Sequence, residues 1–174
     1  MSNDSDPLTV RRSLAVAVIV FGAAFGLHGI DHLRRGMAAS PPSIMVGGII
    51  QGIFVVIAVM LILRHHPSAS AAAIAVGLGS AVLFIYARLL PTFLPSFQGS
   101  FVSGPRINVT WFSWLTAVGE IGTGLVLGYV GLQARRRSAV GLSVPGRRET
   151  PWPHDRPANA TNHLARQDIT NAAH

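Results

Sequence analysis

Long apolar stretches separated by short polar segments dominate the first 137 residues of the chain. Asp, Glu, Lys and Arg are absent from four of these stretches, at residues 14–30, 43–63, 69–87 and 107–119. A helix needs about 20 apolar residues to cross the roughly 30 Å hydrocarbon core of a bilayer. The pattern therefore predicts four transmembrane helices, over residues 14–33, 43–63, 69–90 and 107–133.

Prolines mark the ends of the predicted helices, because a proline inside a helix removes a backbone hydrogen bond. They leave short connections at residues 34–42, 64–68 and 91–106. Short connections favour antiparallel neighbours. The expected fold class is therefore all-α, a polytopic membrane protein with a compact up-down bundle of four transmembrane helices over residues 13–137.

Both ends of the chain differ from this central region. Residues 1–12 form a polar segment, and the first apolar stretch after it is interpreted as an uncleaved helix because three further stretches follow. Residues 138–174 are rich in Pro, Asn, Ala and Arg, without apolar periodicity. Such a segment buries too little apolar surface to offset its ordering entropy, so we predict a disordered cytoplasmic tail.

The composition narrows the class of protein. Hydrophobic residues make up 49% of the chain and charged residues 12%, whereas a typical soluble domain is about 25% charged. This excludes a soluble globular enzyme. The absence of cysteine excludes disulfides, thiolate metal sites and iron–sulfur clusters.

Arginines supply all the positive charge behind the net charge of +7. Arg135, Arg136 and Arg137 directly follow the fourth apolar stretch, a position typical of contact with anionic lipid headgroups rather than nucleic acid. Arginines near the predicted helices are more frequent on the side that holds the two termini. The positive-inside rule therefore predicts a multi-pass plasma-membrane protein with both termini in the cytoplasm.

Small residues spaced by four occur on every predicted helix. Such spacing lets helix backbones approach closely within a bilayer. We expect tight helix contacts at four sets of positions: Gly22 and Gly26, Gly48 and Gly52, Ala73, Gly77 and Ala81, and Gly124 and Gly128.

His28, Asp31 and His32 carry the most specific chemistry in the sequence. Their spacing places them on one helix face, and two imidazoles one turn apart can bind one metal ion. One interpretation is therefore a metal-ion or haem site, or a proton relay, near the outer surface. The other is local pairing of Asp31 with Arg34 and Arg35, which leaves both histidines at the aqueous interface.

Glu120 lies near the middle of the fourth predicted helix and is the other acidic residue expected within the membrane. It is either a ligand to the same metal or a proton acceptor, or a neutral acid hydrogen-bonded to Gln51 or a threonine. Arg88 is expected at the outer end of the third helix, where a salt bridge with Asp31 is predicted. Buried ionisable groups in membranes commonly mark functional sites.

The connection 91–106 is unusually apolar, with Phe93, Phe97 and Phe101 spaced by four. It is expected to lie at the membrane interface or to cover the outward-facing site as a lid. Nucleotide-binding and serine-hydrolase motifs are absent from the sequence. The sequence therefore indicates no catalytic residue, and an enzyme is disfavoured.

Three functions stay open on these grounds. The first is a small membrane protein that binds a metal ion or haem at the His/Asp site. The second is an accessory or assembly subunit of a larger membrane complex, with structural polar residues. The third is a small proton-coupled transporter or channel that acts as a homo-oligomer.

Overall fold

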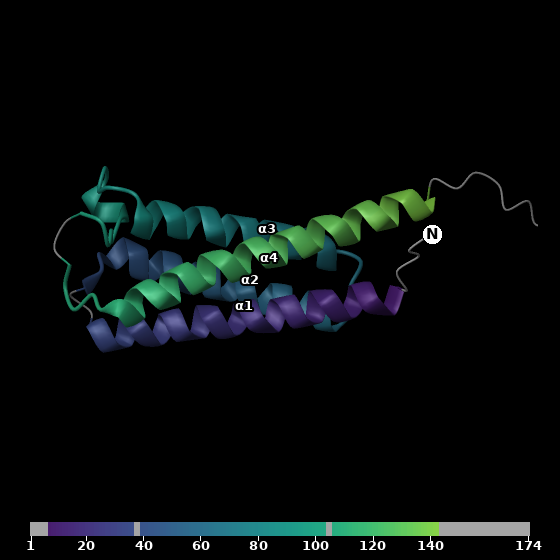
Figure 1. Cartoon of the computed structure of the whole chain (residues 1–174), viewed down its shortest axis with the longest axis horizontal. Coiled ribbons are helices and arrows are strands. Elements are labelled where there is room, and N and C mark those ends of the chain that lie inside the picture. Colours follow the sequence, from purple (N-terminus) through teal and green to yellow (C-terminus); the bar gives the residue numbers. More distant parts are fainter. Residues whose placement is uncertain (1–6, 37–38, 104–105, 143–174) are drawn as a thin grey trace, which may run out of the picture. The chain divides into compact units, whose positions relative to one another are not determined.

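The computed structural model describes residues 7–36, 39–103 and 106–142, and this part of the chain is helical without strands. It contains four long helices: α1 (Pro7–Arg35), α2 (Pro42–Leu63), α3 (Ala69–Phe84) and α4 (Trp111–Leu142) (Figure 1). A π-helical segment η2 (Ile85–Leu89) continues α3, and a short 3₁₀ helix η3 (Pro95–Phe97) lies in the following connection. The helices and their number agree with the sequence prediction.

The helix boundaries differ from the prediction mainly in α1 and α4. α1 begins at Pro7 and includes part of the expected polar segment, since proline fits the first turn of a helix. α4 begins at Trp111 rather than residue 107 and continues through Arg135–Arg137 to Leu142. Of the tail predicted to be disordered, residues 138–142 belong to α4 and residues 143–174 lie outside the described part.

A glycine and a proline mark helix boundaries at one end of the described helical region. α1 stops at Gly36, whose φ of 84° suits glycine and whose N–H donates to the His32 carbonyl at 3.1 Å. α2 starts with Pro42 in its first turn. We call this end, where α1 ends and α4 begins, the loop end; the terminal end is where α1 begins and α4 ends.

Helices α3 and α4 make a close backbone contact. A Cβ atom built on Gly77 would lie 2.6 Å from the Gly124 carbonyl oxygen and 2.6 Å from the Gly128 nitrogen. A Cβ on Gly131 would lie 2.9 Å from the Cβ of Ala73. The small residues predicted on these two helices therefore do face one another.

The corresponding prediction for α1 and α2 is wrong. Cβ atoms built on Gly22, Gly26 and Gly48 would have no heavy atom within 4 Å. One built on Gly52 would meet the ring of Phe25 at 3.5 Å. Gly26 and Gly48 are exposed, so these glycines lie on the outer faces of their helices rather than between them.

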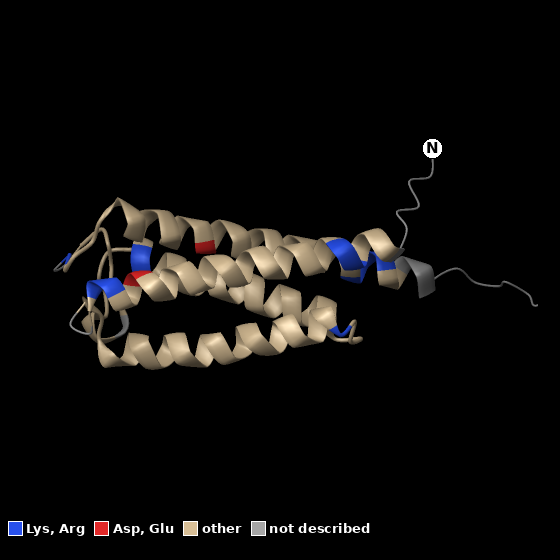
Figure 2. Ribbon diagram, turned by 90° about the horizontal axis from the view of Figure 1, so that it is seen from below, with Lys and Arg blue, Asp and Glu red and all other residues tan. Residues whose placement is uncertain are grey.

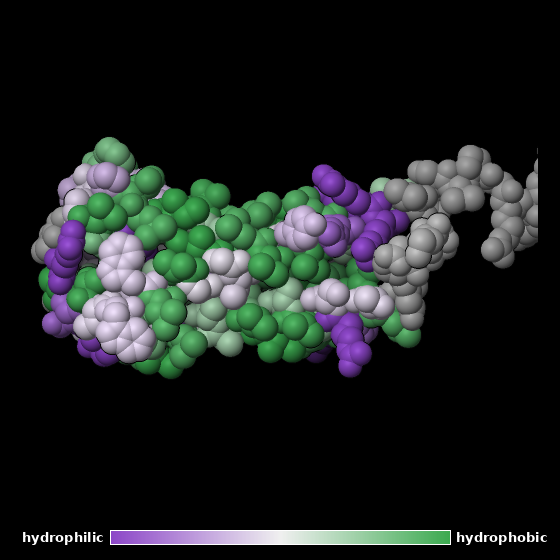
Figure 3. Space-filling view, in the orientation of Figure 1, coloured by the Kyte–Doolittle hydropathy of each residue, from purple (hydrophilic) through white to green (hydrophobic). Residues whose placement is uncertain are grey.

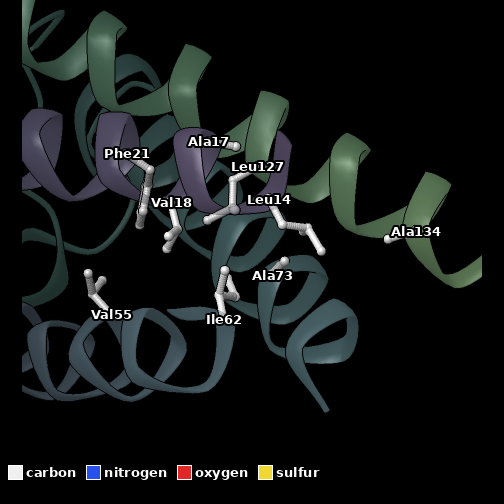
Figure 4. Packing of buried hydrophobic residues seen from close by; sticks show 9 residues of the cluster. All are labelled: Leu14, Ala17, Val18, Phe21, Val55, Ile62, Ala73, Leu127 and Ala134. Atoms are coloured by element: carbon white, nitrogen blue, oxygen red, sulfur yellow. The ribbon is translucent and has the colours of Figure 1, made fainter. Parts of the chain in front are cut away.

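Buried apolar side chains fill the half of the unit nearer the terminal end (Figure 4). Val18, Phe21 and Leu127 are fully buried at its centre. Further members of this apolar cluster are Leu14, Ala17, Val55, Ile62, Ala73 and Ala134. The buried ionisable side chains of the described part lie outside this cluster; they are His28, Asp31, Arg35, Arg88 and Glu120.

The outer surface of the helices is apolar between two charged ends. Large aliphatic side chains such as Ile49, Val56 and Val82 are more than half exposed, and the face in Figure 3 is hydrophobic along the helices. Arginines lie at both ends (Figure 2). All four candidate spans, with η2 extending the third, are long and apolar enough to cross a membrane.

Candidate functional site

A group of buried ionisable side chains lies at the loop end, and we call it the loop-end cluster. Its members on α1 are His28, Asp31, His32 and Arg35, which share one helix face by their spacing. Arg88 from η2 completes it. His28, Asp31, Arg35 and Arg88 are each at most 4% exposed, whereas His32 is half-buried.

Asp31 is held by groups from α1 and α4. Its Oδ1 accepts hydrogen bonds from Arg34 Nη2 at 2.8 Å and from Ser113 Oγ at 3.0 Å. The Arg34 pair is the ion pair found among the described residues. The predicted Asp31–Arg88 salt bridge is therefore wrong, because Arg34 lies one turn away on the same helix and reaches Asp31 first.

His28 is buried rather than at the aqueous interface. Its Nδ1 lies 3.3 Å from Thr116 Oγ1. Since that hydroxyl donates its own proton to the Ser113 carbonyl at 3.1 Å, it accepts from His28 Nδ1–H. A neutral His28 with this tautomer presents an unshared electron pair at Nε2.

His32 is engaged by Arg88. Arg88 Nη2 contacts His32 Nε2, and because a guanidinium can only donate, this imidazole nitrogen accepts. The His28 and His32 rings meet edge to face, with centroids 5.0 Å apart. The two imidazoles thus lie together as predicted, but His32 Nε2 already accepts a hydrogen bond from Arg88.

Arg88 is positioned by the π-helical segment and by the connection that follows it. Leu90 N donates to the Ile85 carbonyl at 3.1 Å, the wide bond of a π turn, and such turns are frequent at functional sites. Arg88 Nη1 donates to the Gly99 carbonyl at 2.8 Å. A side chain at position 99 would collide with Arg88 Nη1, so glycine there permits the contact.

Phe101 covers the two buried arginines. It is fully buried, and its ring centroid lies 5.1 Å from Arg35 Cζ and 5.2 Å from Arg88 Cζ. Its backbone N–H donates to the Arg88 carbonyl at 2.9 Å. Phe93, in contrast, is 67% exposed, so the aromatic residues of this connection take different positions.

The connection is held in place by its own polar side chains. Gln98 Oε1 accepts from the backbone N–H groups of Phe93 and Leu94, and its Nε2 donates to the Tyr86 carbonyl at 3.0 Å. Ser100 Oγ donates to the Leu90 carbonyl at 2.7 Å. These bonds fix the segment that carries Phe101 against the arginines.

Glu120 belongs to a second group, deeper along α4. Its Oε1 accepts from Gln51 Nε2 at 3.1 Å, and the same nitrogen donates to Ser80 Oγ at 2.9 Å. The hydrogen bond to Gln51 that the sequence suggested is therefore present. Ser113 and Thr116, on the same helix, bond to the loop-end cluster instead.

Several buried polar atoms have no hydrogen-bonding partner within the described part of the chain. They are His28 Nε2, Asp31 Oδ2, Arg35 Nη1, Arg88 Nε and Glu120 Oε2. In the same part, His, Asp and Glu side chains do not come together in a group of three that could hold a metal ion. Binding of a metal or haem by His28 and His32 stays a prediction, and it requires Arg88 to leave His32.

Sequence reasoning missed the roles of Arg35 and Phe101. Arg35 was expected to pair with Asp31, but its Nε donates to the Ile107 carbonyl at 3.1 Å. Its spacing of seven from His28 was the available signal. Phe101 had no such signal, because its contacts depend on the path of the connection.

A surface groove lies away from these residues. It has a volume of about 480 Å³ and lies between the first half of α1 and the middle of α4, with Val16, Val20 and Val126 in its walls. Comparison with known proteins gives no further indication of function, since the chain matches no family model, no curated protein and no solved structure.

Proposed function

We propose that this protein is an integral plasma-membrane protein whose four helices cross the bilayer as an up-down bundle, with both termini in the cytoplasm. The length and apolar surface of the helices support this placement. Arg11, Arg12, Arg64 and Arg135–Arg137 belong to the terminal end, against Arg34, Arg35, Arg88 and Arg106 at the loop end. Because the terminal end has more arginines, the positive-inside rule favours a cytoplasmic location for that end. There Arg135–Arg137 contact anionic headgroups.

Within this membrane protein, the loop-end cluster binds a small polar ligand. The observation that carries this proposal is the set of buried polar atoms left without a partner. Leaving such an atom unsatisfied costs about 1–3 kcal/mol, and native proteins keep few of them. Because four of the five belong to the loop-end cluster, a bound molecule that supplies the missing partners explains their retention.

A binding site fits the interior better than a pathway through the membrane. Among the described residues, the buried polar side chains extend from the loop end as far as Glu120 and Ser80, which are joined by Gln51. Beyond them, Val18, Phe21 and Leu127 are fully buried among apolar neighbours. A continuous polar route would need these residues to separate.

The experiment is to purify the full chain in a mild detergent and to identify what it carries. Elemental analysis, an absorbance spectrum and mass spectrometry of the extracted small molecules cover metal ions, haem and organic ligands. We expect a stoichiometric molecule in the wild type and in His66→Ala, an exposed histidine outside the cluster, and its loss in His28→Ala.

A wild-type protein that carries no such molecule, and that takes none up when candidate ligands are added, would contradict the binding proposal. If His28→Ala then only lowered stability, the polar residues would be structural. Co-purification of a larger complex would in that case favour an accessory or assembly subunit.

A further inference from the structure

The loop-end cluster contains buried arginines that form no ion pair among the described residues. Arg35 and Arg88 are 4% and 1% exposed. Their hydrogen bonds go to neutral groups: Arg35 donates to the carbonyls of Ile107 and Ala39, and Arg88 to the carbonyl of Gly99 and to His32. A buried charge is costly unless an opposite charge accompanies it.

The carboxylate nearest to the two arginines is committed elsewhere. Asp31 forms its ion pair with Arg34 through Oδ1. Within residues 7–142, Glu120 is the one other acidic residue in the sequence, and it bonds to Gln51. Arg35 and Arg88 therefore hold two like charges near the same Phe101 ring without an ion-pair partner in the described part.

The unpartnered atoms define the chemistry that would complete the cluster. Arg35 Nη1 and Arg88 Nε are donors that need an acceptor, ideally an anionic oxygen. Asp31 Oδ2 and the electron pair of His28 Nε2 are acceptors that need a donor. The α1 members share one helix face, and Arg88 meets that face through His32.

We infer that the loop-end cluster binds a phosphate group that retains one proton, as in hydrogen phosphate or a phosphate monoester. Its anionic oxygens accept from Arg35 and Arg88, and its hydroxyl donates to Asp31 or His28. This inference rests on the proposed binding function and names its ligand class. The phosphate comes either from a free ion or from a lipid headgroup with a terminal phosphate.

The test is the thermal unfolding of the full chain in a neutral detergent and chloride buffer. Inorganic phosphate at about 100 times its Kd should raise Tm by roughly 5–10 °C. Sulfate at equal ionic strength has a similar shape but no hydroxyl, so it should raise Tm far less. Phosphatidic acid, compared with phosphatidylglycerol in mixed micelles, tests the lipid source in the same assay.

Variants separate the site from general surface charge. Arg35→Lys and Arg88→Lys keep the charge but lose the forked donor geometry of guanidinium, so both should lose most of the phosphate response. Arg106→Gln is the matched control, since Arg106 is an exposed arginine at the same end and its variant should respond like the wild type. If a lysine variant does not fold, Asp31→Asn is tested instead. This variant should narrow the difference between the rise in Tm caused by phosphate and the rise caused by sulfate.

The outcomes are distinct. A response to inorganic phosphate supports a free ion, and a response to phosphatidic acid alone supports a lipid headgroup. No response to either, an equal response to sulfate, or an equal response in all variants overturns the inference. If a different molecule is found in the purified protein, the binding function survives while the phosphate assignment fails; if none is found and phosphate has no effect, both fail.

Discussion

The contact of α3 with α4 at Gly77 predicts how strongly the protein depends on close helix packing. A methyl group at this position would lie 2.6 Å from two backbone atoms of α4, and real Cβ contacts of ordinary length begin at 3.4 Å. Both close contacts are to backbone atoms, so a side-chain rotation cannot relieve them. Gly77→Ala therefore forces the two backbones apart by about 0.8 Å. A gap of this size already forfeits a quarter to a half of the dispersion energy of the separated contacts.

We expect Gly77→Ala to destabilise the protein by about 1–3 kcal/mol, the usual cost of overpacking. In a chain of this size that corresponds to a fall in Tm of roughly 2–12 °C. The assay is thermal unfolding in detergent, followed by circular dichroism. Because helices in lipid gain little from burying apolar surface, the loss of close contact is not compensated elsewhere.

Gly79→Ala is the control on the same helix. Gly79 is exposed, and a Cβ there would have no heavy atom within 4 Å, so this variant should be neutral or slightly more stable. Equal Tm values for the two variants would refute the contact between α3 and α4, and with it the packing of the small-residue faces.

Three further predictions test the polar groups and the topology. Glu120→Ala should lower stability by about 1–3 kcal/mol, because its glutamine partner loses an acceptor, whereas Glu120→Gln should fold normally; equal losses in thermal unfolding would show that the carboxylate itself is required. Gly99→Ala should displace the Arg88 guanidinium and weaken the phosphate response at little cost in Tm, and a full response would contradict the role of this contact. In the cysteine-free chain, Phe93→Cys should react with an impermeant maleimide on intact cells and His66→Cys only after permeabilisation, and the reverse labelling would invert the topology.

The number and approximate positions of the helices follow from the sequence by itself. An apolar stretch of sufficient length without charges satisfies its backbone hydrogen bonds internally as a helix, whatever its neighbours are. The same local reasoning placed His28, Asp31 and His32 on one face, and the pairing of Asp31 with Arg34 needs only their spacing along α1. These features depend on contacts within one helix.

The partners of the polar side chains were decided by the tertiary structure. Ser113 bonds to Asp31 and Thr116 to His28 because of how α1 lies against α4. The glycines Gly22 and Gly26 of α1 have no close contact, because the packing of the helices leaves their positions facing open space. Arg88, in the π-helical segment, meets His32, whereas Asp31 pairs with Arg34. The burial of Phe101 over Arg35 depends on the path of a connection, which no periodicity encodes. Contacts between segments distant in sequence are set by packing of the whole unit, and in this protein they create the charged cluster itself.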